Sequence, residues 1–548
     1  MKKKGTYFLL LFIILLSSIG GANVKLNFDK AFYKPGSEMT LFIEGLEKPI
    51  EYELQISHGV TPIFYLNGTT SGIIKLEVPK ETGGYGIDIK LSNELTISRG
   101  FSVQNHWTDS PRYGFLTDFF PERFDIEKTM NYLVQYHINC LQYYDWMYDY
   151  GKLVYDEGDE YKDAWQRVRK ISNTTLKDLI NEGHKRNIAS MAYVAIYACN
   201  RELGEQHPEW LIYNRSNNSN LIPVDFYKKI LLTNTLKDSG WTKFLINECK
   251  KTIEFGFDGI HLDQYGYPKD LTSYILKDGK YIPYRTSQGF LEFINLLKEE
   301  TNRPVIFNYV NNWPNIIQDK AKVDAVYIEP WESCNTYEDL YMMITGAKEK
   351  SGGKPVILAA YLEAIKKHSI FLADSVIAVS GGRRLEIGEI MRILSGPYFP
   401  GADVIDMKTL DILKDYYDFQ VRYEDFLNGS FEDLSDINFE ENYSIFPKKG
   451  NIWVSIKNSK YGLMINFINL KNLRSSFWRD KQRAPEEYYD LTINFPKNLI
   501  PENSNFYFIS PDGYIKPQEV KKEVNNEKVK LSLPYLKYWS AILVVPQK

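Results

Sequence analysis

The alternation of apolar and polar positions divides the chain into three parts. In residues 23–104, short alternating runs are separated by turns at Pro35-Gly36, Asn67-Gly68 and Gly83-Gly84, and no helical period is present. A period of two with such turns is typical of antiparallel strands. We therefore expect residues 23–104 to form an immunoglobulin-like β-sandwich.

From about Arg112 onward, short apolar runs alternate with amphipathic segments of helical period. Eight strands alternating with helices indicate a (β/α)8 TIM barrel over residues 105–428. The predicted strands are residues 114–118, 139–145, 189–197, 259–264, 305–309, 325–329, 356–362 and 384–388. The predicted helices are residues 126–136, 176–185, 241–255, 289–299, 337–350 and 370–379, with a short helix near 316–321 and a long one over 407–427.

After Asn428-Gly429 the period of two returns, and residues 429–548 predict a C-terminal antiparallel β-domain, a second β-sandwich. The predicted fold class is multidomain α/β plus β, with a central TIM barrel flanked by two β-domains. Because no internal repeat or low-complexity linker separates the three parts, we expect them to pack closely.

Residues 1–22 have the pattern of a secretory signal peptide. Lysines at positions 2–4 precede an apolar run over residues 8–16, and Gly20, Gly21 and Ala22 supply small residues before a cleavage point. The apolar run is too short for a membrane span. We therefore expect a secreted, extracellular protein with no membrane span after cleavage.

Composition narrows the class of partner. The content of 44% hydrophobic and 25% charged residues is ordinary for a globular protein. The formal net charge of −4 disfavours nucleic acid and suits a neutral polysaccharide. The aromatic content of 15% fits either rings that stack on sugars or Tyr-rich strands, and composition leaves both open. We expect a monomer.

Cysteine and histidine usage bears on disulfides and metals. The four cysteines are too sparse for a disulfide scaffold and form no Cys-x-x-Cys motif. Buried free thiols are the favoured interpretation, and a single disulfide is the alternative. The seven histidines are scattered without a metal-ligand spacing, so we expect no catalytic zinc and no cofactor.

Two acidic residues at predicted strand ends are candidates for catalysis. Barrel enzymes place catalytic groups at the carboxyl ends of the strands, and glycoside hydrolysis needs two carboxyl groups. Asp263 and Glu329 each end an apolar run, two strands apart in the predicted barrel. A strand-end Asp can instead cap a turn, and Glu332 is an alternative to Glu329. Pro330 and Trp331 favour Glu329, because apolar neighbours raise a carboxyl pKa as a general acid needs.

Other strand ends carry side chains that bind sugars by ring stacking or hydrogen bonding. A carboxylate at a barrel mouth is as often a salt-bridge partner, so each assignment is a hypothesis. The candidate substrate-binding residues are Asp118, Gln142, Tyr144, Asp145, Trp146, Asn308, Trp331 and Glu386.

A series of motifs recurs in the order of one known family. They include residues 29–36 (DKAFYKPG), 112–119 (RYGFLTDF), 257–264 (FDGIHLDQ) and 327–331 (YIEPW), followed by shorter motifs at 381–382, 385–389, 398–400, 416–419 and 478–480. Together they resemble glycoside hydrolase family 66, which contains dextranases and cycloisomaltooligosaccharide glucanotransferases. The third motif resembles the family's nucleophile strand, and the fourth resembles its acid/base strand.

The resemblance implies a retaining mechanism, with Asp263 as nucleophile and Glu329 as acid/base and no cofactor. It implies an endo-dextranase that cuts the α-1,6-glucosidic linkages of dextran to isomalto-oligosaccharides through a covalent glycosyl-enzyme intermediate. Transferase members usually carry an inserted carbohydrate-binding module, for which this chain has no spare length. Arg384, where a His is common in the family, and residues 148–150 depart from the pattern and leave the subsite contacts open.

Several alternatives remain open from the sequence. The protein could be a cycloisomaltooligosaccharide glucanotransferase, because water and a sugar hydroxyl compete for the same intermediate. The substrate could be another α-glucan or an α-galactan. A non-catalytic glycan-binding surface protein would be expected to lack one carboxylate, whereas both positions are filled. An adhesion protein would need an anchoring motif, and no segment resembles one.

Overall fold

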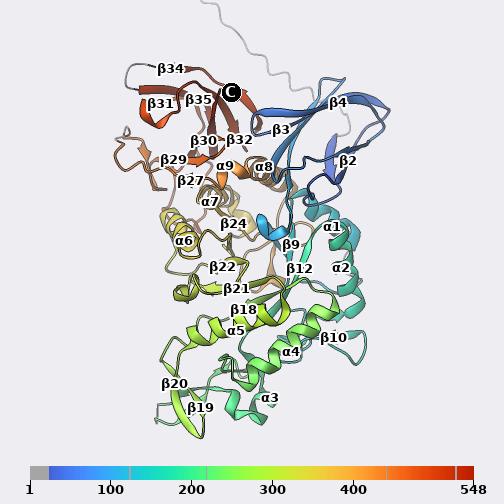
Figure 1. Ribbon diagram of the computed structural model, residues 1–548, viewed down its shortest axis with the longest axis vertical. Helices are drawn as coiled ribbons and strands as arrows, with labels where there is room; N and C mark the ends of the chain where they lie inside the picture. The colour runs from blue at the N-terminus through green and yellow to red at the C-terminus, as the bar shows by residue number, and fades with distance from the viewer. Residues whose placement is uncertain are drawn as a thin grey trace, which may run out of the picture.

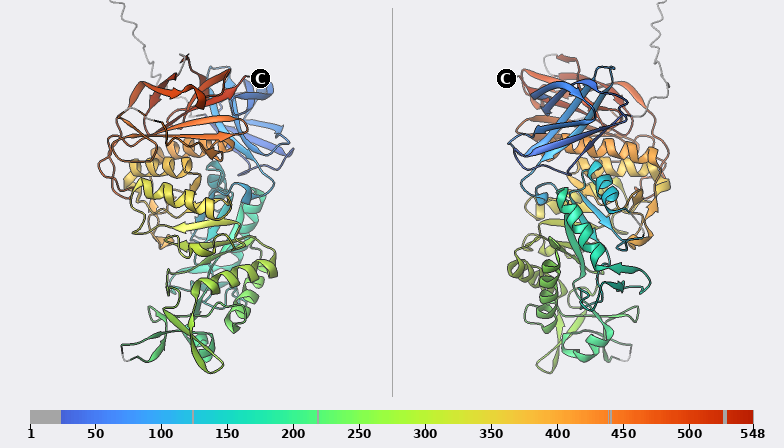
Figure 2. Two further views of the ribbon diagram at one scale, coloured as in Figure 1. Left: turned by 60° about the vertical axis from the view of Figure 1, so that its left-hand side comes forward. Right: turned by 90° about the vertical axis from the view of Figure 1, so that its right-hand side faces the viewer.

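The computed structural model describes residues 24–122, 125–217, 219–437, 439, 441–524 and 528–547. The predicted signal peptide, residues 1–22, lies outside this set. The two β-domains lie next to each other at one end of the molecule, and the barrel and its insertions extend away from them (Figure 1, Figure 2). Strand β7 (Thr96–Val103) of the N-terminal domain contacts β33 (Tyr514–Glu519) of the C-terminal domain.

Eight parallel strands form the barrel sheet, and their order around the sheet is their order along the chain. They are β8 (Tyr113–Leu116), β9 (Cys140–Tyr143), β12 (Ala189–Ala195), β18 (Gly259–Asp263), β21 (Val305–Val310), β22 (Ala325–Glu329), β23 (Val356–Leu358) and β24 (Gly382–Arg384). The barrel is nearly closed, because Phe115 N of β8 donates over 3.1 Å to Ile387 O in the segment that follows β24. The predicted TIM-like barrel is confirmed.

Each of the eight predicted strands is present. Several are shorter than predicted, such as 356–362, which is Val356–Leu358, and the last is also shifted. We predicted residues 384–388, whereas the regular ladder with β23 covers Gly382–Arg384. Beyond Arg384 the chain bonds to two different strands, because Leu385 N donates to Leu358 O of β23 while Ile387 O accepts from Phe115 of β8. The regular pairing therefore ends where the chain begins to close the barrel.

Helices follow most of the barrel strands, and side-chain caps mark where several of them begin. The Asp125 carboxylate accepts from Lys128 N over 3.0 Å at the start of α1. Thr336 and Asp339 form a reciprocal capping box at the start of α6. The helices are α1 (Ile126–Gln135), α2 (Asn173–Lys185), α4 (Gly240–Phe255), α5 (Thr286–Thr301), α6 (Tyr337–Lys350), α7 (Lys367–Val379) and α8 (Met407–Arg422).

Two predicted helices differ from the structure. The short helix expected near residues 316–321 is a single 3-10 turn over Asn315–Ile317. The long helix expected over residues 407–427 is broken at Tyr423, whose φ of −112° and ψ of 21° are not helical, and a short helix α9 (Glu424–Leu427) follows.

Insertions at the carboxyl ends of the barrel strands form small sheets that the sequence pattern did not predict. The strand β14 (Ile212–Arg215), inserted after β12, pairs with β19 (Ser273–Lys277), inserted after β18. The two insertions therefore share a four-stranded sheet with β15 (Leu221–Pro223) and β20 (Lys280–Tyr284), at the end of the molecule opposite the β-domains (Figure 1). Strands of three to five residues leave a weak periodic signal.

The N-terminal domain consists of two antiparallel sheets. One contains β1 (Lys25–Phe28), β2 (Glu38–Glu44) and β5 (Ile73–Glu77), and the other contains β3 (Ile50–His58), β4 (Thr61–Thr70), β6 (Gly83–Leu91) and β7. The β character predicted for this region is present. Its description as immunoglobulin-like stays a prediction.

The C-terminal domain also contains two sheets. The larger includes β29 (Ile452–Ser459), β30 (Gly462–Asn469), β32 (Ser504–Ser510), β33 and β36 (Trp539–Pro546), and the smaller contains β31 (Tyr488–Pro496), β34 (Lys522–Val524) and β35 (Lys528–Leu536). The domain boundaries at residues 104 and 428 stay predictions.

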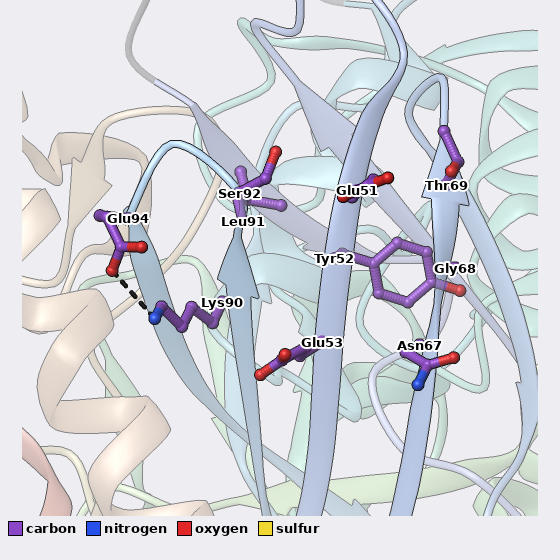
Figure 3. A pocket seen from close by; sticks show the side chains of 10 residues that line it. All are labelled: Glu51, Tyr52, Glu53, Asn67, Gly68, Thr69, Lys90, Leu91, Ser92 and Glu94. Atoms are coloured by element: carbon purple, nitrogen blue, oxygen red, sulfur yellow. Dashed lines mark ion pairs between the residues drawn. The ribbon is translucent and has the colours of Figure 1, made fainter.

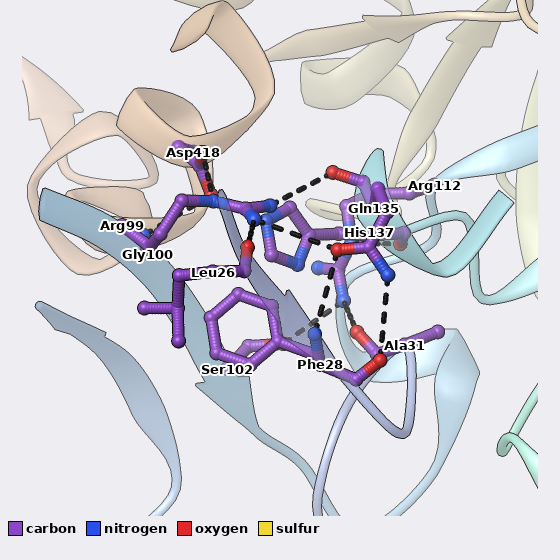
Figure 4. Close-up of polar contacts among 10 residues, drawn as sticks. All are labelled: Leu26, Phe28, Ala31, Arg99, Gly100, Ser102, Arg112, Gln135, His137 and Asp418. Carbon is purple, nitrogen blue, oxygen red and sulfur yellow. Dashed lines mark hydrogen bonds and ion pairs between the residues drawn. The ribbon is translucent and has the colours of Figure 1, made fainter. Parts of the chain in front are cut away.

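Helix α8 joins the N-terminal domain to the barrel through a buried ionic network (Figure 4). The Asp418 carboxylate pairs with Arg99 of β7 and lies 2.8 Å from Nε2 of His137, which follows α1. Arg99 also donates to Gln135 O over 2.9 Å. One turn further along α8, Arg422 pairs with Asp88 of β6 at 2.9 Å. These contacts fix the N-terminal domain on the barrel.

All four cysteines are free and buried, as the favoured interpretation held. Among the described residues, no helix is both long and apolar enough to cross a membrane.

Candidate active site

Asp263 and Glu329 meet at the mouth of the barrel on either side of Asn308. Asp263 ends β18, Glu329 ends β22, and Asn308 lies on β21 between them. The Asn308 nitrogen Nδ2 donates to Asp263 Oδ1 over 2.7 Å and to Glu329 Oε2 over 3.0 Å. Because both oxygens contact one nitrogen, their separation cannot exceed the sum of these two distances, about 5.7 Å.

Two tyrosines hold the remaining carboxylate oxygens. Tyr193 of β12 donates its hydroxyl to Asp263 Oδ2 over 2.7 Å. Tyr361, which follows β23, donates to Glu329 Oε1 over 2.6 Å. Each of the four carboxylate oxygens thus accepts a hydrogen bond from a neutral side chain, which fixes the orientation of both groups.

The two carboxyl groups differ in electrostatic environment. Burial raises the pKa of Glu329 to about 7, the charge of Asp263 adds to the rise, and hydrogen bonds from Tyr361 and Asn308 oppose it. Burial also raises the pKa of Asp263, while hydrogen bonds from Tyr193 and Asn308 lower it. With Asp263 ionised, Glu329 keeps its proton up to near-neutral pH. The site can therefore present one carboxylate and one carboxylic acid together.

The pair faces a cavity of about 510 Å³. Apart from the carboxylates, its walls are mainly aromatic and come from barrel strand ends, from the loops after β9 and β24, and from the insertion after β12. The lining residues are Tyr144, Asp145, Tyr150, Trp165, Tyr193, Phe226, Tyr227, Asp263, Gln264, Tyr265, Val310, Glu329, Trp331, Pro397 and Tyr398.

Three of the predicted substrate-binding residues line this cavity, namely Tyr144, Asp145 and Trp331. The Tyr144 ring stacks on Phe399 with centroids 4.4 Å apart, which fixes the orientation of the Tyr144 ring. Burial raises the pKa of Asp145 to about 7, although Arg169 lies 3.5 Å away and opposes the rise. A fourth predicted residue, Asn308, contacts both carboxylates, as described above.

The other four predicted residues do not line the cavity that holds the carboxylate pair. Trp146 is fully buried, because its ring packs on Phe257 with centroids 4.6 Å apart and its indole nitrogen donates to Tyr193 O over 3.1 Å. Gln142 is buried on β9. Glu386 is buried and forms an internal ion pair with Arg384 at 2.9 Å.

Asp118 lies in a separate cavity of about 480 Å³ at the end of β8, beside Glu389 and Arg169. Glu332, the alternative to Glu329, is exposed and lies outside the carboxylate cavity.

Sequence reasoning missed several residues that line the site or hold its carboxylates. Tyr193 and Tyr361 lie within predicted strands, and the inward period of two that includes Asp263 could have indicated Tyr193, because the register pairs it with His261. Trp165, Phe226 and Tyr227 lie outside the predicted elements, and the high aromatic content was their only sequence signal.

A third cavity, of about 480 Å³, lies on the N-terminal domain (Figure 3). It is lined mainly by charged and small polar residues of β3, β4, β6 and the turn after β6, including Glu51, Glu53 and Lys90, together with Tyr52 and Leu91. The residues that line it all belong to the N-terminal domain. Among the described residues, no group of three His, Cys, Asp or Glu side chains is arranged to hold a metal ion.

Comparison with known proteins places these features in a family. Residues 28–543 match the model of glycosyl hydrolase family 66. A cycloisomaltooligosaccharide glucanotransferase from Niallia circulans is 27% identical over 63% of this chain and 39% of its own length. A dextranase from Streptococcus salivarius is 22% identical over 87% of this chain and 70% of its own length. The chain thus spans about two-fifths of the length of the transferase relative.

A solved structure shares the fold over nearly the whole chain. The cycloisomaltooligosaccharide glucanotransferase of Paenibacillus sp., in complex with cycloisomaltoheptaose, superimposes with a TM-score of 0.86 at 21% identity. The match covers 95% of this chain and 99% of that one. An α-amylase from Geobacillus thermoleovorans matches less closely, with a TM-score of 0.54 over 81% of this chain. Because the family model covers most of the sequence, the chain belongs to glycosyl hydrolase family 66.

Proposed function

We propose that this protein is a retaining endo-glycoside hydrolase that cuts α-1,6-glucosidic linkages of dextran, with Asp263 as nucleophile and Glu329 as acid/base. The contact of both carboxylates with the single Asn308 nitrogen carries the proposal. It limits the bonded oxygens to a separation of about 5.7 Å, below the range of roughly 6.5–9.5 Å between the carboxyl groups of inverting enzymes. That spacing leaves no room for a water molecule to attack from the nucleophile's side.

The reaction has two steps. In the first, an Asp263 oxygen bonds to the anomeric carbon, the glycosidic C–O bond breaks, and Glu329 gives its proton to the departing oxygen. In the second, Glu329, now a carboxylate, takes a proton from water, whose oxygen bonds to the anomeric carbon and releases Asp263. The pKa of Glu329, raised to about 7, suits both the acid role and the base role near neutral pH.

The relatives support an α-1,6-glucan as substrate, and they also support a second candidate function. One relative is named a dextranase and two are named cycloisomaltooligosaccharide glucanotransferases, with higher identity for the transferases. A transferase would resolve the same covalent intermediate with a sugar hydroxyl in place of water. Hydrolysis to linear products and transfer to cyclic products are therefore the two outcomes to separate.

Product analysis of a dextran digest tests the proposal. We expect linear isomalto-oligosaccharides with retained anomeric configuration from the mature protein, and a loss of at least about 10³-fold in kcat for Asp263→Asn and Glu329→Gln. Glu332→Gln is the matched control, because Glu332 is an exposed acid three residues beyond Glu329 and outside the cavity. Cyclic products would establish the transferase activity instead. Dextran that stays intact would refute the proposal that dextran is the substrate.

Secretion and the monomeric state are part of the proposal. The lysines, apolar run and small residues of positions 1–22 support export. Amino-terminal sequencing of the exported protein should begin directly after Ala22, and size-exclusion chromatography should give the mass of one chain.

A further inference from the structure

A hairpin in the insertion after β12 presents an aromatic ring to the cavity at its tip. Strands β16 (Asp225–Phe226) and β17 (Ile230–Leu232) are antiparallel, and Lys229 N donates to Phe226 O over 3.1 Å across the turn. The residues between, Tyr227 and Lys228, have φ values of 54° and 58°. Two consecutive positive φ values characterise a type I′ turn, which favours Asn-Gly.

Local stability does not account for a tyrosine at this tip. A bulky residue at positive φ is unfavourable, because its Cβ crowds the following carbonyl oxygen. Tyr227 gains little from burial in return, since the residue is 75% exposed to solvent. Residues in an unfavourable backbone conformation cluster at ligand-binding positions, and Tyr227 combines such a conformation with an exposed ring beside a cavity.

The surroundings of Tyr227 hold the ring in place. Phe226 stacks on Tyr265 with centroids 4.4 Å apart, and Tyr265 follows the nucleophile by two residues. The Tyr227 ring lies edge-on to Phe226 at 4.6 Å and to Trp165 at 6.0 Å. Lys229 Nζ donates to Trp165 O over 2.6 Å and ties the hairpin to the loop after β9. A row of rings therefore runs from the nucleophile strand outward to an exposed tyrosine.

We propose that Tyr227 is a specificity-determining residue whose exposed ring stacks on a glucosyl unit remote from the bond that is cut, so that the site favours long α-glucan chains over short ones. This inference rests on the proposed function. Sugar rings present C–H faces that an exposed aromatic ring covers, and the contact removes apolar surface from water. Asn308, Tyr193 and Tyr361 donate to the Asp263 and Glu329 carboxylates, and Tyr227 lies outside this group, so its effect is on binding of the chain.

The first experiment compares substrates of different length. For Tyr227→Ala, we expect kcat/KM on dextran to fall about five- to tenfold, the loss when roughly 40–60 Å² of apolar area stays in water. The same variant should keep its kcat/KM on the shortest isomalto-oligosaccharide that the wild type cuts. Tyr227→Phe keeps the ring and should match the wild type on both substrates. Equal effects on long and short substrates, or none on either, would overturn the inference.

A second set of variants separates function from folding. Lys228→Gly relieves one positive φ and keeps the ring, so it should raise the thermal unfolding midpoint without loss of activity on dextran. The double variant Tyr227→Asn with Lys228→Gly supplies the preferred turn. We expect it to be more stable than the wild type and yet as poor on dextran as Tyr227→Ala. Full activity in the stabilised double variant would contradict the role of the ring.

A binding measurement distinguishes failure of this inference from failure of the proposed function. Native electrophoresis in gels that contain dextran measures retention, and Asp263→Asn in each of the proteins compared prevents cleavage during the run. We expect the wild type to be retarded more than Tyr227→Ala, and Tyr227→Phe to match the wild type. A wild type that cuts dextran, together with equal retention of all three proteins, would refute the role of Tyr227 alone. A wild type that neither binds nor cuts dextran would refute the proposed function.

Discussion

At the scale of single residues, one amide nitrogen organises the carboxylate pair. Asn308 donates to both Asp263 and Glu329, and a tyrosine holds the far oxygen of each. These four hydrogen bonds, donated by three side chains, stabilise the ionised forms, whereas burial favours the protonated forms. The balance leaves Glu329 with a pKa near 7, so small changes in its hydrogen bonds should move the pH dependence of the reaction.

Tyr361→Phe should shift the alkaline limb of the pH profile upward. The Tyr361 hydroxyl lowers the pKa of Glu329, so its removal raises that pKa, and the acid keeps its proton to higher pH. We expect the alkaline limb of kcat/KM to move up by about one pH unit, the equivalent of one hydrogen bond to a charged group. Tyr489→Phe, an exposed and distant change, should leave the profile unmoved. A limb that stays in place or moves down would show that Glu329 does not govern it.

Asn308→Ala tests whether this residue acts on the carboxylates or on the sugar. Loss of the shared donor should misalign both groups and lower kcat by roughly 10²-fold or more, with KM nearly unchanged. Separate measurement of kcat and KM distinguishes the two roles. A higher KM at unchanged kcat would instead support the substrate-binding role that the sequence suggested.

At the scale of secondary-structure elements, the parallel register of the barrel strands builds the site and helix α8 supports it. The register pairs Ala195 with Asp263, Leu262 with Phe307 and Asn308 with Tyr327. Asn308 is therefore level with Asp263, and Glu329 lies two residues further along β22. Helix α8 contacts β6 and β7 of the N-terminal domain and β33 of the C-terminal domain. It therefore transmits stability between the domains.

Asp418→Asn should weaken this connection strongly. Burial alone would raise the pKa of Asp418, but Arg99 and His137 lower it below its ordinary value. Loss of the charge leaves Arg99 buried beside a neutral group, which costs about 3–5 kcal/mol of unfolding free energy, measured by urea denaturation. Asp411→Asn on an exposed position of the same helix is the control and should cost less than about 0.5 kcal/mol.

The ion pair of Asp418 with Arg99 also predicts how the free energy of unfolding depends on pH in the acid range. Because the folded pKa of Asp418 is lowered, its stabilisation is present above the unfolded pKa of about 3.9 and is lost as pH falls through the lower folded value. The wild type should lose this part of its stability at acid pH, and Asp418→Asn should show a flatter dependence there. Parallel curves for the two proteins would mean that the ion pair contributes nothing.

At the scale of the whole molecule, the two β-domains and the barrel share one buried interior. Trp539 of β36 packs on Phe419 of α8 with ring centroids 4.7 Å apart, and Tyr416 donates to Asp512 over 3.0 Å. A second apolar cluster belongs to the C-terminal domain alone and includes Ile465 and Phe508. The C-terminal domain thus has an apolar core of its own and also packs on helix α8.

Trp539→Ala should destabilise the barrel as well as the C-terminal domain. Removal of this fully buried ring costs about 3–5 kcal/mol and uncovers α8. We expect activity, tryptophan fluorescence and far-ultraviolet circular dichroism to be lost together on heating, at a lower temperature than in the wild type. A fluorescence transition well below the loss of activity would show that the C-terminal domain unfolds independently.

Prediction from the sequence succeeded where local periodicity carries the information. Each of the eight barrel strands was predicted, because buried parallel strands are continuous apolar runs that end in polar residues. The same pattern places Asp263 and Glu329 at strand ends. It failed for the short strands of the insertions, whose two to five residues leave little periodic signal, and for the helix that breaks at Tyr423.

The candidate substrate residues show the same limit. Tyr144, Asp145 and Trp331 line the cavity, whereas Trp146 and Glu386 are buried in packing and in an ion pair. Tyr144, Asp145 and Trp146 are consecutive, yet only the first two line the cavity. They follow the end of β9 at Tyr143, where the alternation of a strand no longer predicts the direction of each side chain.

The sequence by itself determined the barrel strands, the β character of both flanking regions and the two strand-end carboxyl groups, because each depends on residues close together in the chain. Only the tertiary structure decided that Asn308 bridges those carboxyl groups, that Tyr193 and Tyr361 orient them, and that Tyr227 reaches the same cavity. These contacts join residues that lie tens of positions apart. They form only when barrel closure and the folded insertions bring separate strand ends to one place, and no local pattern specifies that.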